Sequence, residues 1–117
     1  MSCADAGWGI LFGRNPQEAA DLALIRRHAA EACQSPIMNV QDGILVTHTI
    51  ANVLLPEKEF MEAYVGRPED RIINLFDVDK PLMTGSVQDQ DSYMKGKIAQ
   101  RHYYVHMKPA VSRAMQA

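Results

Sequence analysis

The run Asn15-Pro16-Gln17-Glu18 constrains the fold of this chain more than any other segment. Asn15 is a favoured N-cap, Pro16 fits the first helical position because its missing N–H would be unpaired there, and Glu18 is placed to reach back as in a capping box. A stripe spaced by three, four and seven follows, made of Ala19, Leu22, Ala23, Ala29, Ala30 and Cys33. This pattern predicts an amphipathic helix that ends before Ser35-Pro36. The polar positions expected to face water are Asp21, His28 and Glu31.

Two short apolar runs flank this helix. Residues 8–12, Trp-Gly-Ile-Leu-Phe, end at a glycine, and residues 37–40, Ile-Met-Asn-Val, end before the turn pair Asp42-Gly43. Both runs have the length and composition of buried strands. The order strand, helix, strand predicts a βαβ unit, whose strands should be parallel and whose crossover should be right-handed.

The remainder of the chain is less regular. Residues 50–55 could form a third strand, and a helix is predicted from about residue 57 to Val65, where Gly66 and Pro68 stop it. We expect residues 66–88 to be an extended connection across the surface and residues 89–107 to form a helix, with Pro109 starting a last turn or two. The apolar stripe of that helix is Met94, Ile98, His102 and Val105. The predicted fold class is α/β, a partial doubly wound layer of two or three parallel strands with flanking helices.

Length and composition restrict the function. At 117 residues the chain is one domain or part of one, and a net charge of -2 gives no general attraction to nucleic acid or anionic membranes. The two cysteines are too few for a disulfide framework or an iron-sulfur cluster, which indicates a reduced, cytoplasmic protein. No membrane span is expected, because the most apolar window is short and interrupted by polar residues. No signal peptide is expected, because the first twenty residues lack a basic start followed by an apolar core.

Parallel sheets are normally wider than two or three strands and are covered on both faces. At least one strand edge of this layer should therefore lack a partner. We interpret the chain as a piece of a larger domain, or as a protomer that another chain completes.

The residues placed best for chemistry follow the second strand. Asp42, Gly43, Thr47 and His48 come at the carboxyl end of that strand, where ligands bind in open α/β sheets. Asp-Gly is also a common turn pair, and a single histidine beside an apolar run is usually packed and hydrogen-bonded. On the residues alone this structural interpretation is the more common one.

Other chemistry has less support. His102 and His106 have the spacing of a helical metal pair but lack a third ligand, and Asp77 with Asp79 resembles a solvated turn. The phosphate-binding glycine loops and the G-x-S-x-G nucleophile motif are absent. We therefore assign no catalytic, cofactor-binding or metal-binding residue within the chain.

The order of several short motifs is nevertheless informative. They are Gly7-Trp8, then Gln17-Glu18-Ala19-x-Asp21-Leu22-Ala23, then Ser35-Pro36, then Asp42-Gly43 with Thr47-His48, and finally Pro81, Gly85, Gln88, Asp91 and Tyr93. In this order the chain resembles the thiamine-diphosphate-dependent 2-oxoacid oxidoreductases of the pyruvate:ferredoxin (or flavodoxin) oxidoreductase family. The resemblance runs from Gly7 onward and corresponds to the later half of the pyrimidine-binding domain. Ile44 and Thr49 depart from the family, which usually has an aromatic after the Asp-Gly and, in single-chain members, an acid after the histidine.

The resemblance implies oxidative decarboxylation of pyruvate or a related 2-oxoacid to an acyl-coenzyme A. It implies thiamine diphosphate and Mg²⁺ in the complete enzyme, iron-sulfur clusters in other domains, and ferredoxin or flavodoxin as electron acceptor. The glutamate that activates the cofactor lies upstream of the matched region, so we expect the chain to bind no cofactor alone and to be inactive alone.

The expected organisation is one partial domain over residues 1–117, the C-terminal half of a pyrimidine-binding domain. Its partners would be the remaining domains or subunits and coenzyme A, in an enzyme that is a dimer when complete, with Asp42, Gly43, Thr47 and His48 at the active-site rim or a domain contact. The alternative is a non-catalytic α/β binding or oligomerisation module.

Overall fold

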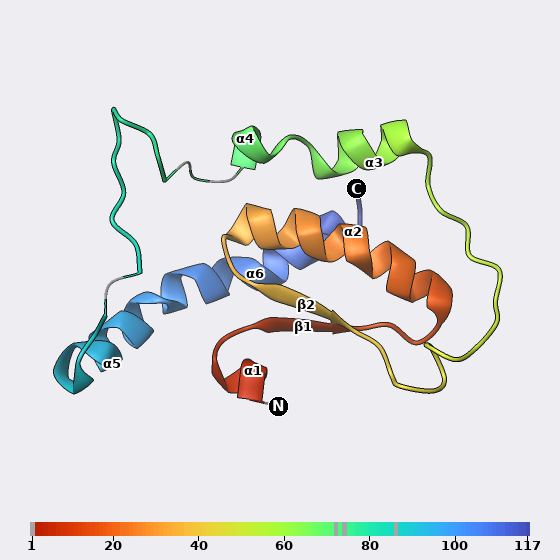
Figure 1. The fold of residues 1–117 in the computed structure, drawn as a ribbon, viewed down its shortest axis with the longest axis horizontal. Helices are drawn as coiled ribbons and strands as arrows, with labels where there is room; N and C mark the ends of the chain where they lie inside the picture. Colours follow the sequence, from red (N-terminus) through yellow and green to blue (C-terminus); the bar gives the residue numbers. More distant parts are fainter. Residues whose placement is uncertain (1, 72, 74, 86) are drawn as a thin grey trace.

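The computed structural model describes residues 2–71, 73, 75–85 and 87–117 (Figure 1). In chain order the elements are α1 (Ser2–Asp5), β1 (Gly9–Phe12), α2 (Pro16–Cys33), β2 (Ile37–Val40), α3 (Lys58–Val65), α4 (Pro68–Arg71), α5 (Gln90–Ala99) and α6 (Arg101–Ala114). The predicted α/β class is confirmed. Within the described ranges, no helix is both long enough and apolar enough to cross a bilayer.

The βαβ unit is confirmed. β1 and β2 pair in parallel, with Gly9 opposite Ile37 and Phe12 opposite Val40, and they form a two-stranded sheet. α2 connects them and lies with α6 over one face of the sheet (Figure 1). The free edges of the two strands give the described part of the chain the open layer that the sequence predicts.

The start of α2 follows the sequence closely. The Asn15 side chain accepts a hydrogen bond from the Glu18 backbone N–H at 2.8 Å, and Pro16 is the first helical residue. The Glu18 carboxylate does not return to the Asn15 backbone as in a capping box, but accepts from the Arg14 backbone N–H at 2.9 Å and pairs with the Arg14 guanidinium. Because this arginine donates to it, the pKa of Glu18 is lowered.

The core lies between α2 and α6. Its buried residues are Ala29, Cys33, Ile37, Ala110 and Ala114. Small side chains on both helices let the two backbones approach closely, so the alanine stripe of α2 packs more extensively against α6 than against the sheet. The helix α6 thereby supplies a layer that the βαβ pattern did not predict.

The predicted third strand at residues 50–55 is wrong. Among the described residues only β1 and β2 are strands, and residues 49–57 are irregular. The Leu54 backbone N–H donates to Gln17 Oε1 at 2.8 Å, and Gln17 Nε2 donates to the Leu54 carbonyl at 2.9 Å. Because one side-chain amide binds both polar groups of Leu54, this backbone pairs with α2 instead of a strand edge.

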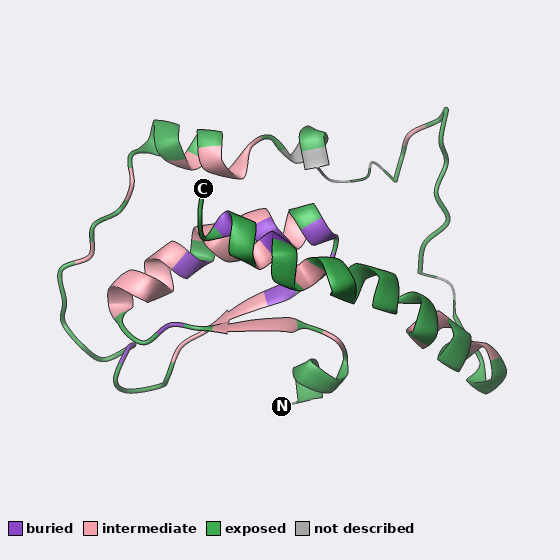
Figure 2. Ribbon diagram, turned by 180° about the vertical axis from the view of Figure 1, so that it is seen from behind, coloured by how far each residue is buried: buried purple, intermediate pink, exposed green. Residues whose placement is uncertain are grey.

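The C-terminal helix also differs from the prediction. It breaks at Gln100 into α5 and α6, and Pro109 lies inside α6 instead of starting a new turn. The predicted apolar stripe does not face the core, since Met94, Ile98 and Val105 are 61%, 57% and 65% exposed. The core contacts come from the C-terminal half of α6, and α5 projects away from the sheet (Figure 2).

The molecule is open for its size. Its radius of gyration is 16.9 Å, whereas a compact domain of this length has about 13 Å. The accessible surface is 9305 Å², against about 6,400 Å² expected for a compact protein of this mass. Residues 66–88 contribute to this shape, because beyond the short α4 their described part has no regular structure.

Candidate functional site

The loop after β2 is organised by Asp42. Its Oδ1 accepts hydrogen bonds from the backbone N–H groups of Ile44 at 2.7 Å, of Leu45, and of Val46 at 3.4 Å. These bonds, that of Ile44 foremost, lower the pKa of the exposed Asp42 carboxyl. Val46 is buried and anchors the loop to the body. Asp42 therefore holds its own loop in shape.

Thr47 and His48 form a polar pair in the same loop. The Thr47 hydroxyl and His48 Nδ1 are hydrogen-bonded at 3.0 Å, and the His48 backbone N–H donates to the Ile44 carbonyl at 3.1 Å. Both side chains are exposed. Since Nδ1 is engaged by Thr47, Nε2 is the nitrogen of His48 that a group outside the loop can meet.

The structure does not require a glycine at position 43. A Cβ on Gly43 would meet no atom within 4 Å, and its backbone is outside the left-handed region. The structure thus places Asp42, Gly43, Thr47 and His48 in one exposed loop, with Thr47 and His48 in contact and Asp42 bound to backbone.

Sequence reasoning missed a link between α2, α3 and α6. His28 Nδ1 is 2.7 Å from the Tyr64 carbonyl, the two rings are 4.8 Å apart, and the Tyr64 hydroxyl donates to the Ala114 carbonyl. His28 is half-buried by these contacts and does not face open water as predicted. No local pattern indicates the link, because its members are 36 and 50 residues apart.

A groove of about 650 Å³ lies between the C-terminal end of α2 and four residues of the later connection, Ile73, Leu75, Leu82 and Thr84. Trp8 and Tyr103 lie at its walls together with Arg26 and Glu31. The prediction that Glu31 faces water is wrong, because its side chain is only 8% exposed and is paired with Arg27. Ile73, Leu75, Leu82 and Thr84 line the same groove as Glu31, which the helical period alone could not show.

The metal hypotheses gain no support. The rings of His102 and His106 are 5.1 Å apart, but in the described part of the chain no three His, Cys, Asp or Glu side chains are grouped to hold a metal ion. Asp77 accepts from the backbone N–H groups of Asp79 and Lys80 at 2.9 and 3.3 Å, which is the hydrogen bonding of a turn.

Among the described residues, we identify no set of side chains that would hold a divalent cation for the diphosphate of thiamine diphosphate. Its diphosphate is normally held through a divalent cation, and no cation cluster exists among the described residues. The buried carboxylate of Glu31 is already paired with Arg27. We therefore derive no step through the cofactor from this chain.

The fold defines the class of protein as an α/β domain with an open parallel layer. Residues 1–116 match the family model described as pyruvate flavodoxin/ferredoxin oxidoreductase, thiamine diphosphate-binding. The chain belongs to this family, which confirms the resemblance found in the motif order.

Individual relatives agree. The chain is 30% identical over 95 residues to pyruvate synthase subunit PorA of Methanothermobacter thermautotrophicus, and 31% identical over 99 residues to the PorA subunit of Pyrococcus furiosus. These alignments cover 80% and 83% of the chain, but only 24% and 25% of the relatives. Pyruvate-flavodoxin oxidoreductase of Klebsiella pneumoniae is 26% identical over 117 residues, which cover 98% of the chain and 10% of that enzyme. No solved structure gives a significant match.

Proposed function

We propose that this chain forms part of a 2-oxoacid:ferredoxin or flavodoxin oxidoreductase. The enzyme would convert pyruvate or a related 2-oxoacid, with coenzyme A, to an acyl-coenzyme A and carbon dioxide, passing two electrons to the acceptor. The observation that carries the proposal is the family match over residues 1–116. The names of the relatives, pyruvate synthase and pyruvate-flavodoxin oxidoreductase, support the reaction class.

The chemistry is shared with parts of the enzyme outside these residues. Thiamine diphosphate, with Mg²⁺, supplies the means to stabilise the carbanion left by decarboxylation, and iron-sulfur clusters of other domains carry the electrons. This chain would act as scaffold for the pyrimidine-binding region in a cytoplasmic enzyme that is a dimer when complete. Its open surface, 9305 Å² against about 6,400 Å² for a compact protein of this mass, supports a need for those other parts.

Within the scaffold, we assign the loop with Asp42, Gly43, Thr47 and His48 to the active-site rim or to a domain contact. The loop follows a strand's carboxyl end, the edge of an open α/β sheet at which ligands bind. Asp42 sets the loop shape, and the exposed Thr47–His48 pair is the part that can meet a substrate or a neighbouring domain.

The test of the overall function is an activity assay on the complex purified from its native host through a tag on this chain. We expect reduction of a low-potential viologen dye that requires both the 2-oxoacid and coenzyme A, and none from the isolated chain. A purified complex with its iron-sulfur clusters and thiamine diphosphate that reduces no dye with any 2-oxoacid would contradict the proposal.

The rim assignment has its own test in the same complex. His48→Ala should raise KM for the 2-oxoacid or lower kcat by about tenfold, as expected when one polar contact worth about 1.4 kcal/mol is lost. His106→Ala is the matched control, an exposed histidine on α6 that should leave both constants unchanged. Unchanged KM and kcat in His48→Ala would contradict the assignment of the loop to the active-site rim.

The alternative, a non-catalytic module, predicts stability in isolation. A compact 117-residue module would expose about 6,400 Å², and the 9305 Å² of this chain argues against it. Thermal unfolding of the isolated chain distinguishes the module from the enzyme fragment. A single sharp transition with a defined dimer mass favours the module, whereas an aggregating or molten chain favours the fragment.

A further inference from the structure

The groove at the C-terminal end of α2 contains polar groups that the proposed function does not use. Its walls come from separate parts of the chain, namely Trp8 before β1, the last turns of α2, the start of β2, Tyr103 on α6 and the later connection. All of these lie on the same side of the molecule (Figure 1). A cavity of about 650 Å³ has the size at which proteins bind small molecules.

Glu31 is the buried polar side chain of this groove. Its side chain is only 8% exposed, and Oε1 pairs with Arg27. Within the part of the chain that the structure describes, Oε2 has no hydrogen-bond partner. Because a buried charged oxygen without a partner is costly, Oε2 is a place for an N–H donor that a ligand brings into the groove.

Arg26 brings an unpaired positive charge to the same groove. Its side chain is half-buried and lines the groove, and no described residue forms an ion pair or a hydrogen bond with it. Arg26 and Glu31 are five residues apart on α2, which is about 7.5 Å along the helix axis. The groove therefore presents a cation and an anion that one small ligand can reach together.

Most of the remaining lining is apolar or aromatic. Trp8 and Tyr103 are 42% and 40% exposed, so their rings retain surface for a ligand. Ile37 is 3% exposed and belongs to the core, which gives the groove a rigid side, and Leu82 lines it from the later connection. Two aromatic walls favour a ligand that itself carries an aromatic ring.

A strained backbone position borders the same groove. Gln34, the residue that ends α2, has φ 51° and is the only non-glycine residue with a positive φ among those the structure describes. A glycine would adopt this conformation at a lower cost. Strain of this kind is concentrated at binding sites, so the position of Gln34 agrees with a ligand in the groove.

We propose that this groove binds a free α-amino acid with an aromatic side chain. The carboxylate of the ligand meets Arg26, its ammonium group donates to Glu31 Oε2, and its ring lies against Trp8 and Tyr103. A zwitterion supplies both of the charges that the groove leaves unpaired, whereas a simple acid or amine supplies one. The groove lies at the start of β2 and the loop with Asp42 at its end, so this binding does not depend on the proposed catalytic function.

Calorimetric titration of L-phenylalanine into the complex purified through a tag on this chain tests the proposal. We expect saturable binding at one site per copy of the chain. Two analogues test the two charges: L-phenylalaninamide lacks the carboxylate that Arg26 binds, and N-acetyl-L-phenylalanine lacks the ammonium group that Glu31 binds. Each analogue should bind at least tenfold more weakly. Absence of saturable L-phenylalanine binding, or an analogue that binds as tightly as L-phenylalanine, would overturn the proposal.

Two variants locate the binding in the groove. Glu31→Gln keeps the size of the side chain and removes its charge, and Arg26→Gln removes the guanidinium group. Each variant complex should bind L-phenylalanine at least tenfold more weakly than the wild type. Wild-type affinity in both variants would overturn the proposal, and the analogues on the wild-type complex give the answer where a variant fails to assemble.

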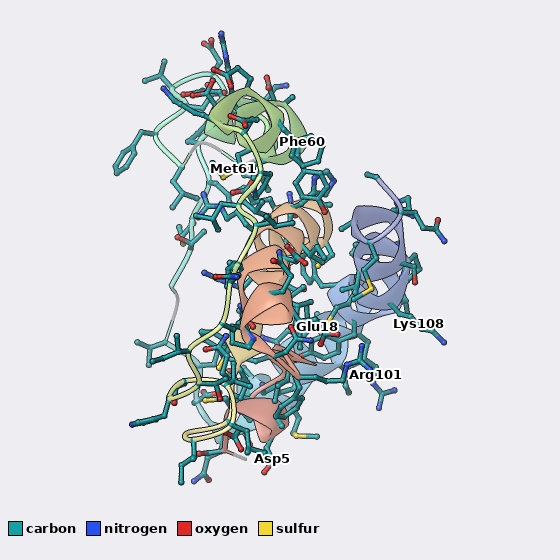
Figure 3. All side chains as sticks on the ribbon, turned by 90° about the vertical axis from the view of Figure 1, so that its right-hand side faces the viewer. Asp5, Glu18, Phe60, Met61, Arg101 and Lys108 are labelled. Atoms are coloured by element: carbon teal, nitrogen blue, oxygen red, sulfur yellow. The ribbon has the colours of Figure 1, made fainter. Side chains whose placement is uncertain are left out.

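Matched controls come from exposed positions. Glu62 is the acid of the Lys58–Glu62 pair, which has the same four-residue spacing as Arg27–Glu31 but leaves Glu62 68% exposed. Arg101 points outward from α6 (Figure 3). Glu62→Gln and Arg101→Gln should bind L-phenylalanine as the wild type does. Equal losses in these controls and in the groove variants would overturn the assignment of the ligand to the groove.

Discussion

The Asp42 carboxylate and the Gln17 amide, two residues of the family-like motifs, both bind backbone of their own chain. Asp42 accepts from three successive backbone N–H groups, and Gln17 binds both polar groups of Leu54. Gln17 also donates to Asp21 at 2.9 Å. At these positions the motif residues hold the local backbone of this chain.

Asp42 predicts a dependence of stability on pH. The folded protein lowers the pKa of this carboxyl. The ionised carboxylate therefore stabilises the fold fully above the unfolded pKa of about 3.9, and this stabilisation is lost as the pH falls through the folded pKa. Urea unfolding followed from pH 6 to pH 3 should show a loss in the wild type that is smaller in Asp42→Asn. Parallel curves for the two proteins would contradict the role given to Asp42.

Two glycines are expected to respond differently to alanine. Gly7 has φ +90°, and a Cβ there would overlap the Tyr104 hydroxyl, so Gly7→Ala should destabilise by on the order of 1 to 3 kcal/mol. Gly43→Ala should be neutral within about 0.5 kcal/mol, because it has open space and an ordinary backbone. Urea denaturation of both variants checks the difference, and an equal loss would contradict it.

At the scale of elements, α2 organises the chain. It contacts both strands of the sheet, α6 and α3, and its Gln17 binds the backbone of Leu54. A substitution that weakens the N-terminus of α2 should therefore lower the free energy of unfolding of the whole chain and not only fray the first turn of the helix.

Asn15→Ala tests the start of α2. Loss of the N-cap bond to the Glu18 backbone should cost about 1 kcal/mol of unfolding free energy. Asn52→Ala, at an exposed position outside any helix or strand, is the control and should change little. Thermal or urea unfolding measures both, and equal stability of the Asn15 variant and the wild type would contradict the cap.

The elements that follow from local rules were predictable from sequence. The cap at Asn15, the strand at residues 37–40 and the end of α3 before Gly66 depend on neighbouring residues alone. The Gln17–Leu54 clamp and the outward stripe of α5 were not, because they depend on contacts 37 residues apart and on the absence of a covering surface. In the candidate site, the sequence predicted that Asp42 to His48 follow β2. It did not predict the burial of the Glu31 side chain.

At the scale of the whole molecule, exposure is the dominant property. Apolar side chains that a self-sufficient domain would bury are exposed to water. They lie on α5 and the first half of α6, on β1, and in the described part of residues 66–88. The family match and the 24% to 25% coverage of the PorA relatives agree with a unit that works inside a larger enzyme. We therefore propose that the chain supplies scaffold and active-site rim, and that other parts of the enzyme complete the cofactor site.

The most direct test is calorimetric titration of thiamine diphosphate with Mg²⁺ into the isolated chain and into the cofactor-depleted complex purified through it. We predict no binding by the isolated chain, because its described residues offer no group of His, Cys, Asp or Glu side chains that could hold the cation, and stoichiometric binding by the complex. Stoichiometric binding by the chain alone, or none by a folded complex, would contradict it.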